Sequence, residues 1–477
     1  MIGRTLPRRT LGLLLLLACF LTVGCASYRH QQFRAESKTT VETADYALHF
    51  IEADDEGWFW ESDQAHTAIE LVRRKVQQRN TIVLVFVHGW HHSAQCCDDD
   101  VEGFKETLIR LKRQLGAPAH EAMQSKEVER TDRTNDINVV GIYIGWRGRS
   151  LPGPLNYFSF WGRKSSAERV GNADFGELIS RLNDVYLQHN SRRQDEAPKK
   201  TPGGSTHFLG LVTIGHSFGG QVLLKAVNTT LEERLLHNNP VPAYLRGSRP
   251  ADPRTETATV SGVGDLLVLL NPAIEAAQYH RLHVLAQGLN YPSEQTPIML
   301  TVSAKNDVPR HRLFTFGRML GELFTGKPRK EDPMEREVER KALGVYRDHI
   351  THRLVASDPS VKLVSTRIEH PREPGCDGDA PCTCDFLEWD AAPAIREPDS
   401  ITAGSKPQLQ DYDFSAQLTF NNVKLLPQPN AIAYQPFIVA EADESIIDGH
   451  NGIFTAPFIE FLVSYIAFVE TKYAQLR

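Results

Sequence analysis

Continuous runs of apolar and β-branched residues recur along the chain, each bounded by polar or turn-forming residues. Such runs are typical of strands that are buried on both faces of a parallel sheet. We expect strands at residues 81–87, 137–144, 208–214, 266–270 and 298–302, with shorter candidates at 46–51 and 437–440.

Segments with a helical pattern lie between several of these runs. We expect helices at 64–76, 101–115, 175–186 and 221–236, and a terminal helix with one apolar face formed by Phe458, Leu462, Tyr465, Ile466 and Val469. Strands that alternate with helices predict an α/β fold, with a mostly parallel central sheet flanked by helices.

Four stretches interrupt this alternation, and we interpret them as insertions on one core. They lie near residues 188–205, 237–263, 327–341 and 371–435. The first two are rich in proline or in polar residues and glycine, as expected of loops. The third is a dense run of mixed charge that indicates an exposed helix, and the fourth shows little periodicity.

The first 24 residues have the pattern of a secretory signal, with three arginines before a 13-residue apolar run at 11–23. The small residues before Cys25 resemble the lipobox of bacterial lipoproteins, which implies a lipidated Cys25 at the mature N-terminus. Ala26 then favours, by the same resemblance, the outer membrane, facing the periplasm or the surface. An ordinary secretory signal beside an unrelated cysteine is the alternative. Residues 25–44 are expected to be a tether and 45–477 the folded domain.

The composition agrees with a globular protein. Apolar residues make up 41% and charged residues 23% of the 477 residues, so a sizeable core can form. The net charge is −6, and it is −9 without residues 1–24, which carry three arginines and no acid. An acidic chain without a basic block is a poor nucleic-acid binder. No apolar run reaches 18 residues, so no transmembrane helix is expected.

Export would bring the cysteines into an oxidising compartment. Without Cys19 in the signal and a lipidated Cys25, five remain: Cys96, Cys97, Cys376, Cys382 and Cys384. The last three share a Gly/Pro/Asp-rich loop, where we expect a disulfide whose pairing the spacing leaves open. A metal site there would need a fourth ligand that the spacing does not supply.

A nucleophile is predicted where the strand at 208–214 runs into Gly215-His-Ser217-Phe-Gly219-Gly220. A Gly-x-Ser-x-Gly turn between strand and helix strains the serine backbone and exposes its Oγ. The following helix places its N-terminus at the serine, where developing negative charge is favoured. The alternative is a glycine-rich turn without chemistry.

An oxyanion hole is predicted beside this turn. The strand at 81–87 ends in His88-Gly89-Trp90, and the loop after such a strand can direct a backbone N–H at the nucleophile. We expect the N–H groups of Trp90 and Phe218 to stabilise the oxyanion of a tetrahedral intermediate.

A metal cluster is the rival interpretation of the same loop, which carries His88, His91, His92 and the acids at 98–100. Their spacing does not match the metalloprotease helix pattern. We therefore predict no metal, with His91 and His92 as solvent-facing or supporting residues.

A serine nucleophile needs a base that a third group orients. For the order serine, acid, histidine, Asp307 just past the strand at 298–302 is the predicted acid, with Glu275 and Asn306 as competitors. The predicted base is His450.

His450 lies in the glycine-flanked loop at 448–452, between the strand at 437–440 and the terminal helix. His349 and His352 are its alternatives. Asp448 is expected to cap the loop or to support the site.

These motifs together resemble the α/β-hydrolase superfamily, over most of residues 45–477 outside the insertions. The segments 86–90, 215–220, 303–307 and 448–452 resemble those of largely uncharacterised serine esterase- or lipase-like proteins. The resemblance implies that Ser217 attacks, His450 transfers the proton and Asp307 orients the imidazole, through an acyl-enzyme and without a cofactor. The separation of 143 residues between Asp307 and His450 is long for this fold.

The preferred function is a carboxylic-ester hydrolase that acts on a lipid or an acylated small molecule at the envelope. Amidase, thioesterase or acyltransferase chemistry on the same triad is the alternative among enzymes, and a non-catalytic envelope scaffold is the alternative of another class. An aromatic segment at 151–161, flanked by Arg147, Arg149 and Arg163, would suit a lid or an acyl-binding wall, a contact with the sheet, or a contact with lipid.

Overall fold

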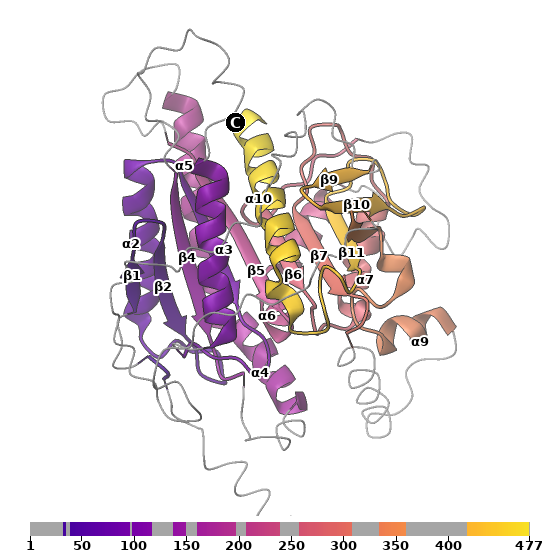
Figure 1. The fold of residues 1–477 in the computed structure, drawn as a ribbon, viewed down its shortest axis with the longest axis horizontal. Coiled ribbons are helices and arrows are strands. Elements are labelled where there is room, and N and C mark those ends of the chain that lie inside the picture. Colours follow the sequence, from indigo (N-terminus) through magenta and orange to yellow (C-terminus); the bar gives the residue numbers. More distant parts are fainter. Residues whose placement is uncertain are drawn as a thin grey trace, which may run out of the picture.

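A computed structural model of the chain describes residues 32–34, 39–95, 98–116, 137–148, 160–196, 207–238, 257–307, 333–358 and 417–476. They form a mixed, mostly parallel sheet with helices on both faces (Figure 1). The prediction of an α/β fold with such a sheet is confirmed.

Within the described residues, the sheet has the order β1-β2-β4-β3-β5-β6-β7-β11-β8-β10-β9. All pairings from β2 to β8 (His352–Ala356) along this order are parallel, and those at the two edges are antiparallel. The seven predicted strands appear as β2 (Ala47–Glu52), β3 (Thr81–Val87), β4 (Asn138–Gly145), β5 (Leu209–His216), β6 (Leu266–Leu270), β7 (Met299–Ala304) and β11 (Phe437–Ala442).

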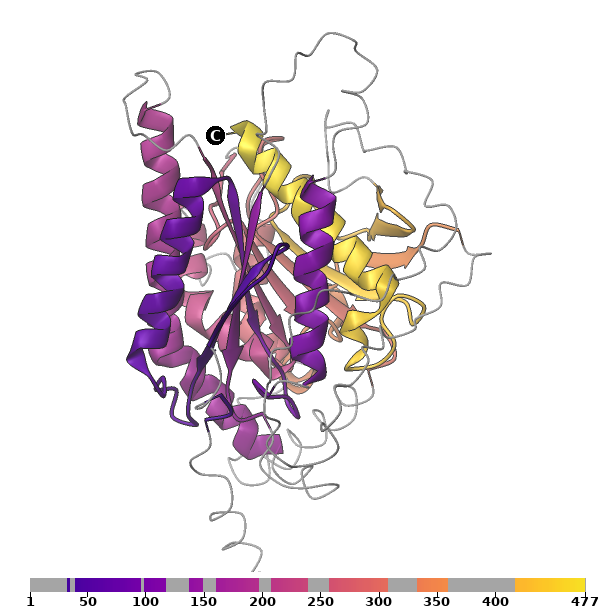
Figure 2. The ribbon, with the colours of Figure 1, turned by 60° about the vertical axis from the view of Figure 1, so that its left-hand side comes forward.

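Two apolar clusters lie on opposite faces of the sheet, and alternate residues of each central strand enter them. Val83 and Val85 of β3 pack into one cluster, and Leu84 and Phe86 pack into the other. The first cluster takes side chains from α2 (Ser62–Gln78), α4 (Phe160–Asn172), α5 (Asp174–Glu196), α6 (Phe218–His237) and α7 (Ala276–Gln287). The second takes them from α3 (Asp99–Gly116) and α10 (Ala456–Leu476). Figure 2 shows α2 and α5 across the sheet from α3 and α10. Burial on both faces explains the continuous apolar runs.

The expected tether before residue 45 is wrong in part. Thr40–Glu42 form β1, which pairs antiparallel with β2. Upstream of it, the backbone N–H groups of Phe33 and Arg34 donate to the buried carboxylate of Glu52. An edge strand buries few side chains, so β1 has no apolar run from which it could be predicted.

Regular structure also extends into stretches expected to be insertions. Helix α5 continues to Glu196, and β9 (Leu418–Phe420) and β10 (Val423–Pro427) lie within 371–435. Helix α9 (Pro333–Arg340) lies in the charged helix predicted at 327–341, of which residues 327–332 lie outside the described residues. Strand β10 pairs with β8 at the edge of the sheet. Helix ends and edge strands face solvent, which weakens the hydrophobic periodicity.

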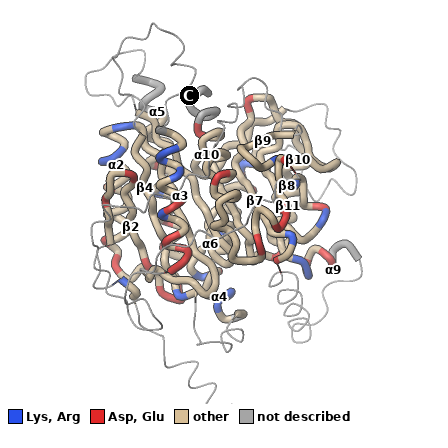
Figure 3. Tube along the Cα trace, in the orientation of Figure 1, with Lys and Arg blue, Asp and Glu red and all other residues tan. Residues whose placement is uncertain are grey.

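Charges of both signs are interspersed along the described trace (Figure 3). Arg147 and Arg163, expected beside a lid or wall, both pair with Asp55. Residues 151–159 of that aromatic segment lie outside the described residues. In the part of the chain that the structure describes, no helix is long and apolar enough to cross a membrane.

Candidate active site

Ser217 lies at the turn between β5 and α6, as the sequence pattern predicts. Its backbone angles are φ 54° and ψ −117°, a conformation that residues other than glycine rarely adopt. The Ser217 N–H donates to Leu270 O (2.9 Å), and Ser217 O accepts from Ala273 N–H (3.0 Å). These bonds to the neighbouring β6 segment hold the strained turn, which fits a residue that must present its side chain at one place.

Gly219 allows α6 to approach the end of β3. A Cβ atom at this position would lie 2.0 Å from Val87 O and 2.6 Å from His88 O. Both contacts are with backbone, so no side-chain rotation relieves them. The second glycine of the motif is therefore required by packing around the turn.

Gly219→Ala is expected to lower the free energy of unfolding by about 3 kcal/mol, because α6 or β3 must move. Gly162→Ala is the control, since a Cβ there meets nothing within 4 Å. Alanine is the better helix former, so the control should be unchanged or slightly more stable. Chemical denaturation followed by circular dichroism measures both, and equal stability of the two variants would contradict the packing argument.

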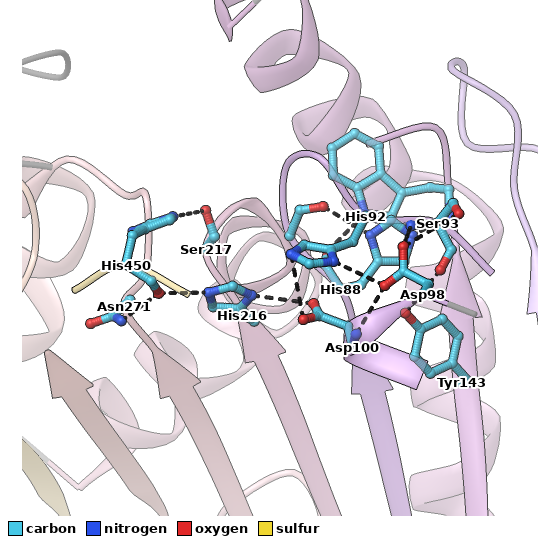
Figure 4. Close-up of polar contacts among 12 residues, drawn as sticks. His88, His92, Ser93, Asp98, Asp100, Tyr143, His216, Ser217, Asn271 and His450 are labelled. Atoms are coloured by element: carbon cyan, nitrogen blue, oxygen red, sulfur yellow. Dashed lines mark hydrogen bonds and ion pairs between the residues drawn. The ribbon is translucent and has the colours of Figure 1, made fainter. Parts of the chain in front are cut away.

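Ser217, His450 and Asp307 form one hydrogen-bonded line (Figure 4 shows the first two). Ser217 Oγ lies 2.7 Å from His450 Nε2, and His450 Nδ1 lies 2.8 Å from Asp307 Oδ2. The Asp307 side chain is fully buried, and that of His450 is 13% exposed. The carboxylate accepts from Nδ1–H, which leaves Nε2 as the acceptor for the serine proton.

Strand order explains the 143 residues between the acid and the histidine. After β7 the chain forms β8, β9 and β10, and it returns as β11 between β7 and β8. Strands β11 and β7 are parallel neighbours, with Ala442 opposite Ala304. Because carboxyl ends of neighbouring parallel strands meet at one edge, Asp307 and His450 come together there.

Two asparagines hold the loop that carries His450. The Asn271 amide donates to His450 O (2.7 Å) and Gly449 O (3.2 Å), and its Oδ1 accepts from Ala304 N–H (2.7 Å). Asn306 donates to Asp448 Oδ1 (2.8 Å) and accepts from Gly449 N–H (2.8 Å). Asn306 and Asp448 thus support the loop. The role of Asn271, the first residue after β6, was missed; its position at a strand end was the only signal.

Glu275, the alternative acid, binds elsewhere. Its buried carboxylate pairs with Lys164 Nζ at 2.6 Å and accepts from Gln278 Nε2 at 2.6 Å. Lys164 belongs to α4, so this ion pair joins α4 to the start of α7. Of the two acids, Asp307 is the one bonded to His450.

The alternative bases are also engaged away from Ser217. His349 Nε2 lies 3.0 Å from His280 Nδ1. Burial, with His283 and His280 nearby, lowers the pKa of His349 to about 2, so its ring is neutral. His352 Nδ1 bonds Thr351 Oγ1 at the start of β8.

The loop after β3 lies directly against the serine. A Cβ atom on Gly89 would be 2.7 Å from Ser217 Cβ, so Trp90 follows at close range. Phe218 is the first residue of α6, where backbone N–H groups point out of the helix end. The side chains of Trp90 and Phe218 both contact Phe160, with ring centroids 5.2 and 4.9 Å apart. Both predicted oxyanion-hole residues therefore flank Ser217.

His88 positions this loop. Its Nδ1–H donates to Gly89 O (2.9 Å), and its Nε2 accepts from Trp146 N–H (3.0 Å). The Trp146 indole in turn donates to His88 O. Burial lowers the pKa of His88 to about 4, which keeps the ring neutral as both bonds require.

His91 is exposed and His92 is buried, so His91 agrees with the solvent-facing alternative and His92 with the supporting one. Its Nδ1 bonds Asp98 Oδ1 at 2.9 Å. Cys25 and the five cysteines Cys96, Cys97, Cys376, Cys382 and Cys384 lie outside the described residues.

Three comparisons with known proteins were made. The chain matches no protein-family model. Searches of curated proteins and of solved structures likewise found no match.

Proposed function

We propose that the protein is a serine hydrolase, and that its reaction is the hydrolysis of a carboxylic ester. The observation that carries the proposal is the line from Ser217 Oγ through His450 to the buried Asp307, with distances of 2.7 and 2.8 Å. Each distance lies within the range in which a base can take a proton and a third group can orient it. A binding protein would have no use for this alignment.

In the proposed reaction, His450 Nε2 takes the Ser217 proton as Oγ attacks the ester carbonyl carbon. Asp307 stabilises the imidazolium that forms, and the N–H groups of Trp90 and Phe218 stabilise the oxyanion. His450 then protonates the leaving alcohol, and an acyl-enzyme remains on Ser217. Water, deprotonated by His450, then attacks the acyl carbon. The bond from that carbon to Ser217 Oγ breaks, His450 returns its proton to Oγ, and the acid leaves. None of these reaction steps needs a cofactor.

The α/β-hydrolase fold is part of the proposal. Its support is the serine at a strand–turn–helix junction, the loop after β3 beside it, and the chain order Ser217, Asp307, His450. The helices on both faces of a mostly parallel sheet agree with this fold. These features concern the fold, and the proposed function is argued from the site residues.

An ester with an apolar acyl group is the favoured substrate. Trp90, Phe160 and Phe218 form a group of aromatic side chains next to the serine. Phe218 is fully buried, so an acyl chain beside Ser217 would contact the small exposed parts of Trp90 and Phe160. Amides, thioesters and acyl transfer use the same triad, so a substrate panel must separate them.

The test combines covalent labelling with turnover. The purified chain is expected to react with a fluorophosphonate probe at Ser217 and to hydrolyse p-nitrophenyl esters of short and long acids. Labelling without ester turnover would keep the serine hydrolase and move the substrate to amides or thioesters. Absence of both labelling and turnover would favour an envelope scaffold.

We further propose that the protein is a lipoprotein of the bacterial envelope, anchored through Cys25, on the basis of residues 1–26. Metabolic labelling with a palmitate analogue should mark the wild type and spare Cys25→Ser, because serine cannot form the thioether. The variant should also leave the membrane fraction. Equal lipid labelling of both proteins would contradict the proposal.

A further inference from the structure

A second cluster of polar side chains lies beneath Ser217, buried from solvent. It consists of His92 in the loop after β3, Asp100 in the first turn of α3, and His216, the last residue of β5. Their exposed fractions are 7%, 1% and 0%. One ligand-type atom from each lies within 4.8 Å of the other two (Figure 4).

Both histidines donate one ring N–H to an acceptor outside this cluster. His92 Nδ1 lies 2.9 Å from Asp98 Oδ1, and His216 Nε2 lies 3.1 Å from His450 O. Both partners accept only, so the ring nitrogens must donate. This is the arrangement typical of metal-bound histidines, whose second N–H is fixed by a carboxylate or a backbone carbonyl.

The other ring nitrogens face one carboxylate. His92 Nε2 lies 3.5 Å from Asp100 Oδ1, and His216 Nδ1 lies 3.3 Å from Asp100 Oδ2. In neutral rings with the assigned donors, these nitrogens carry lone pairs, so three electron-pair donors converge. Buried charge is costly unless it is compensated, so a positive charge is needed between them.

Asp100 is suited to bind a cation, because a carboxylate oxygen is one of the ligands that zinc takes beside histidine nitrogens.

We infer that His92, Asp100 and His216 bind one divalent transition-metal ion, with zinc as the best fit. Zinc bonds to nitrogen and oxygen of about 2.0–2.2 Å in tetrahedral geometry separate neighbouring ligand atoms by about 3.3–3.5 Å. The two distances to Asp100 are of this size. They end on different oxygens, Oδ1 for His92 and Oδ2 for His216, so binding through one oxygen requires the carboxylate to turn. Three protein ligands leave one coordination position for water or another ligand.

The ion would lie behind the base of the proposed triad. His216 would bind the ion through Nδ1, and its Nε2–H donates a hydrogen bond to His450 O. The same carbonyl accepts from Asn271, so the metal would help to fix the His450 loop. The metal site stands on its own ligands and does not require that Ser217 be catalytic.

The test measures metal in the full-length chain, purified without a histidine tag. After exposure to zinc and extensive dialysis, elemental analysis is expected to find about one zinc per chain. Asp100→Asn and His92→Gln should each retain at least tenfold less. His283→Gln is the control from a separate histidine cluster and should retain the wild-type amount.

A second readout uses the wild type alone, so it does not depend on the folding of a variant. Zinc should raise the melting temperature of the metal-free protein by about 3 °C or more, because it binds the folded state. Cobalt in place of zinc should give visible absorption bands without a thiolate charge-transfer band.

Three results would each overturn the inference. In the first, the wild-type protein retains less than about 0.1 zinc per chain and its melting temperature does not shift. In the second, the wild type and folded Asp100→Asn retain equal amounts of zinc. In the third, a cobalt–thiolate band appears, which would place the metal on cysteines. The first of these would assign the positive charge to protons, as two imidazolium rings around Asp100.

Discussion

Replacing Ser217 by alanine is expected to lower kcat/KM for the best ester at least about 10⁴-fold and to abolish fluorophosphonate labelling. The change removes the only atom of this residue that can attack a carbonyl carbon. In serine hydrolases, loss of the nucleophile leaves only the rate enhancement that comes from binding and the oxyanion hole. The fold should survive, because the turn is held by backbone bonds from Ser217 to Leu270 and Ala273.

Ester turnover and probe labelling of both proteins, at matched circular dichroism, provide the measurement. Ser464→Ala on α10 is the matched control; its hydroxyl contacts Asn421 and should not affect activity. Labelling that persists in Ser217→Ala would place the nucleophile on another residue. Activity that falls equally in the control would point to general damage.

Much of the central sheet could be predicted from sequence because its strands are buried on both faces. The run at 81–87 coincides with β3, and 266–270 coincides with β6. Burial leaves no polar positions, so these segments stand out from their surroundings. Strand β1 and the pair β9 and β10 lie at the edges, where one side faces solvent and the pattern fades.

Ser217, Asp307 and His450 could be proposed because each follows a strand whose end was visible in the sequence. Their contacts depend on β11 pairing beside β7, which no local pattern indicates. For the same reason, the sequence showed His92 and Asp100 in one loop region but did not show which third residue lies beside them. The third member of that cluster, His216, is 116 residues from Asp100 and was noticed only as part of the serine motif.

The choice between Asp307 and Glu275 gives the other large expected effect. Asp307→Asn should lower kcat about 10³–10⁴-fold with little change in KM. An asparagine amide can donate to His450 Nδ1, which favours the tautomer that carries its proton on Nε2. That nitrogen faces Ser217 Oγ at 2.7 Å and could then no longer accept the serine proton. A comparable loss follows the same replacement in the serine protease triad.

Glu275→Gln is the matched control, since it removes the same charge from a buried carboxylate that contacts Lys164 rather than His450. We expect it to lower stability, because Lys164 loses its buried partner, while kcat of the folded fraction stays within a few-fold of wild type. Steady-state kinetics beside denaturant melts separate the two effects. Should folded Glu275→Gln lose kcat while Asp307→Asn keeps it, Glu275 would be the acid and the observed bond from Asp307 to His450 would belong to a resting arrangement. The ion pair of Glu275 with Lys164 argues against that outcome, because a carboxylate held at 2.6 Å by a buried ammonium would have to abandon it to reach the imidazole.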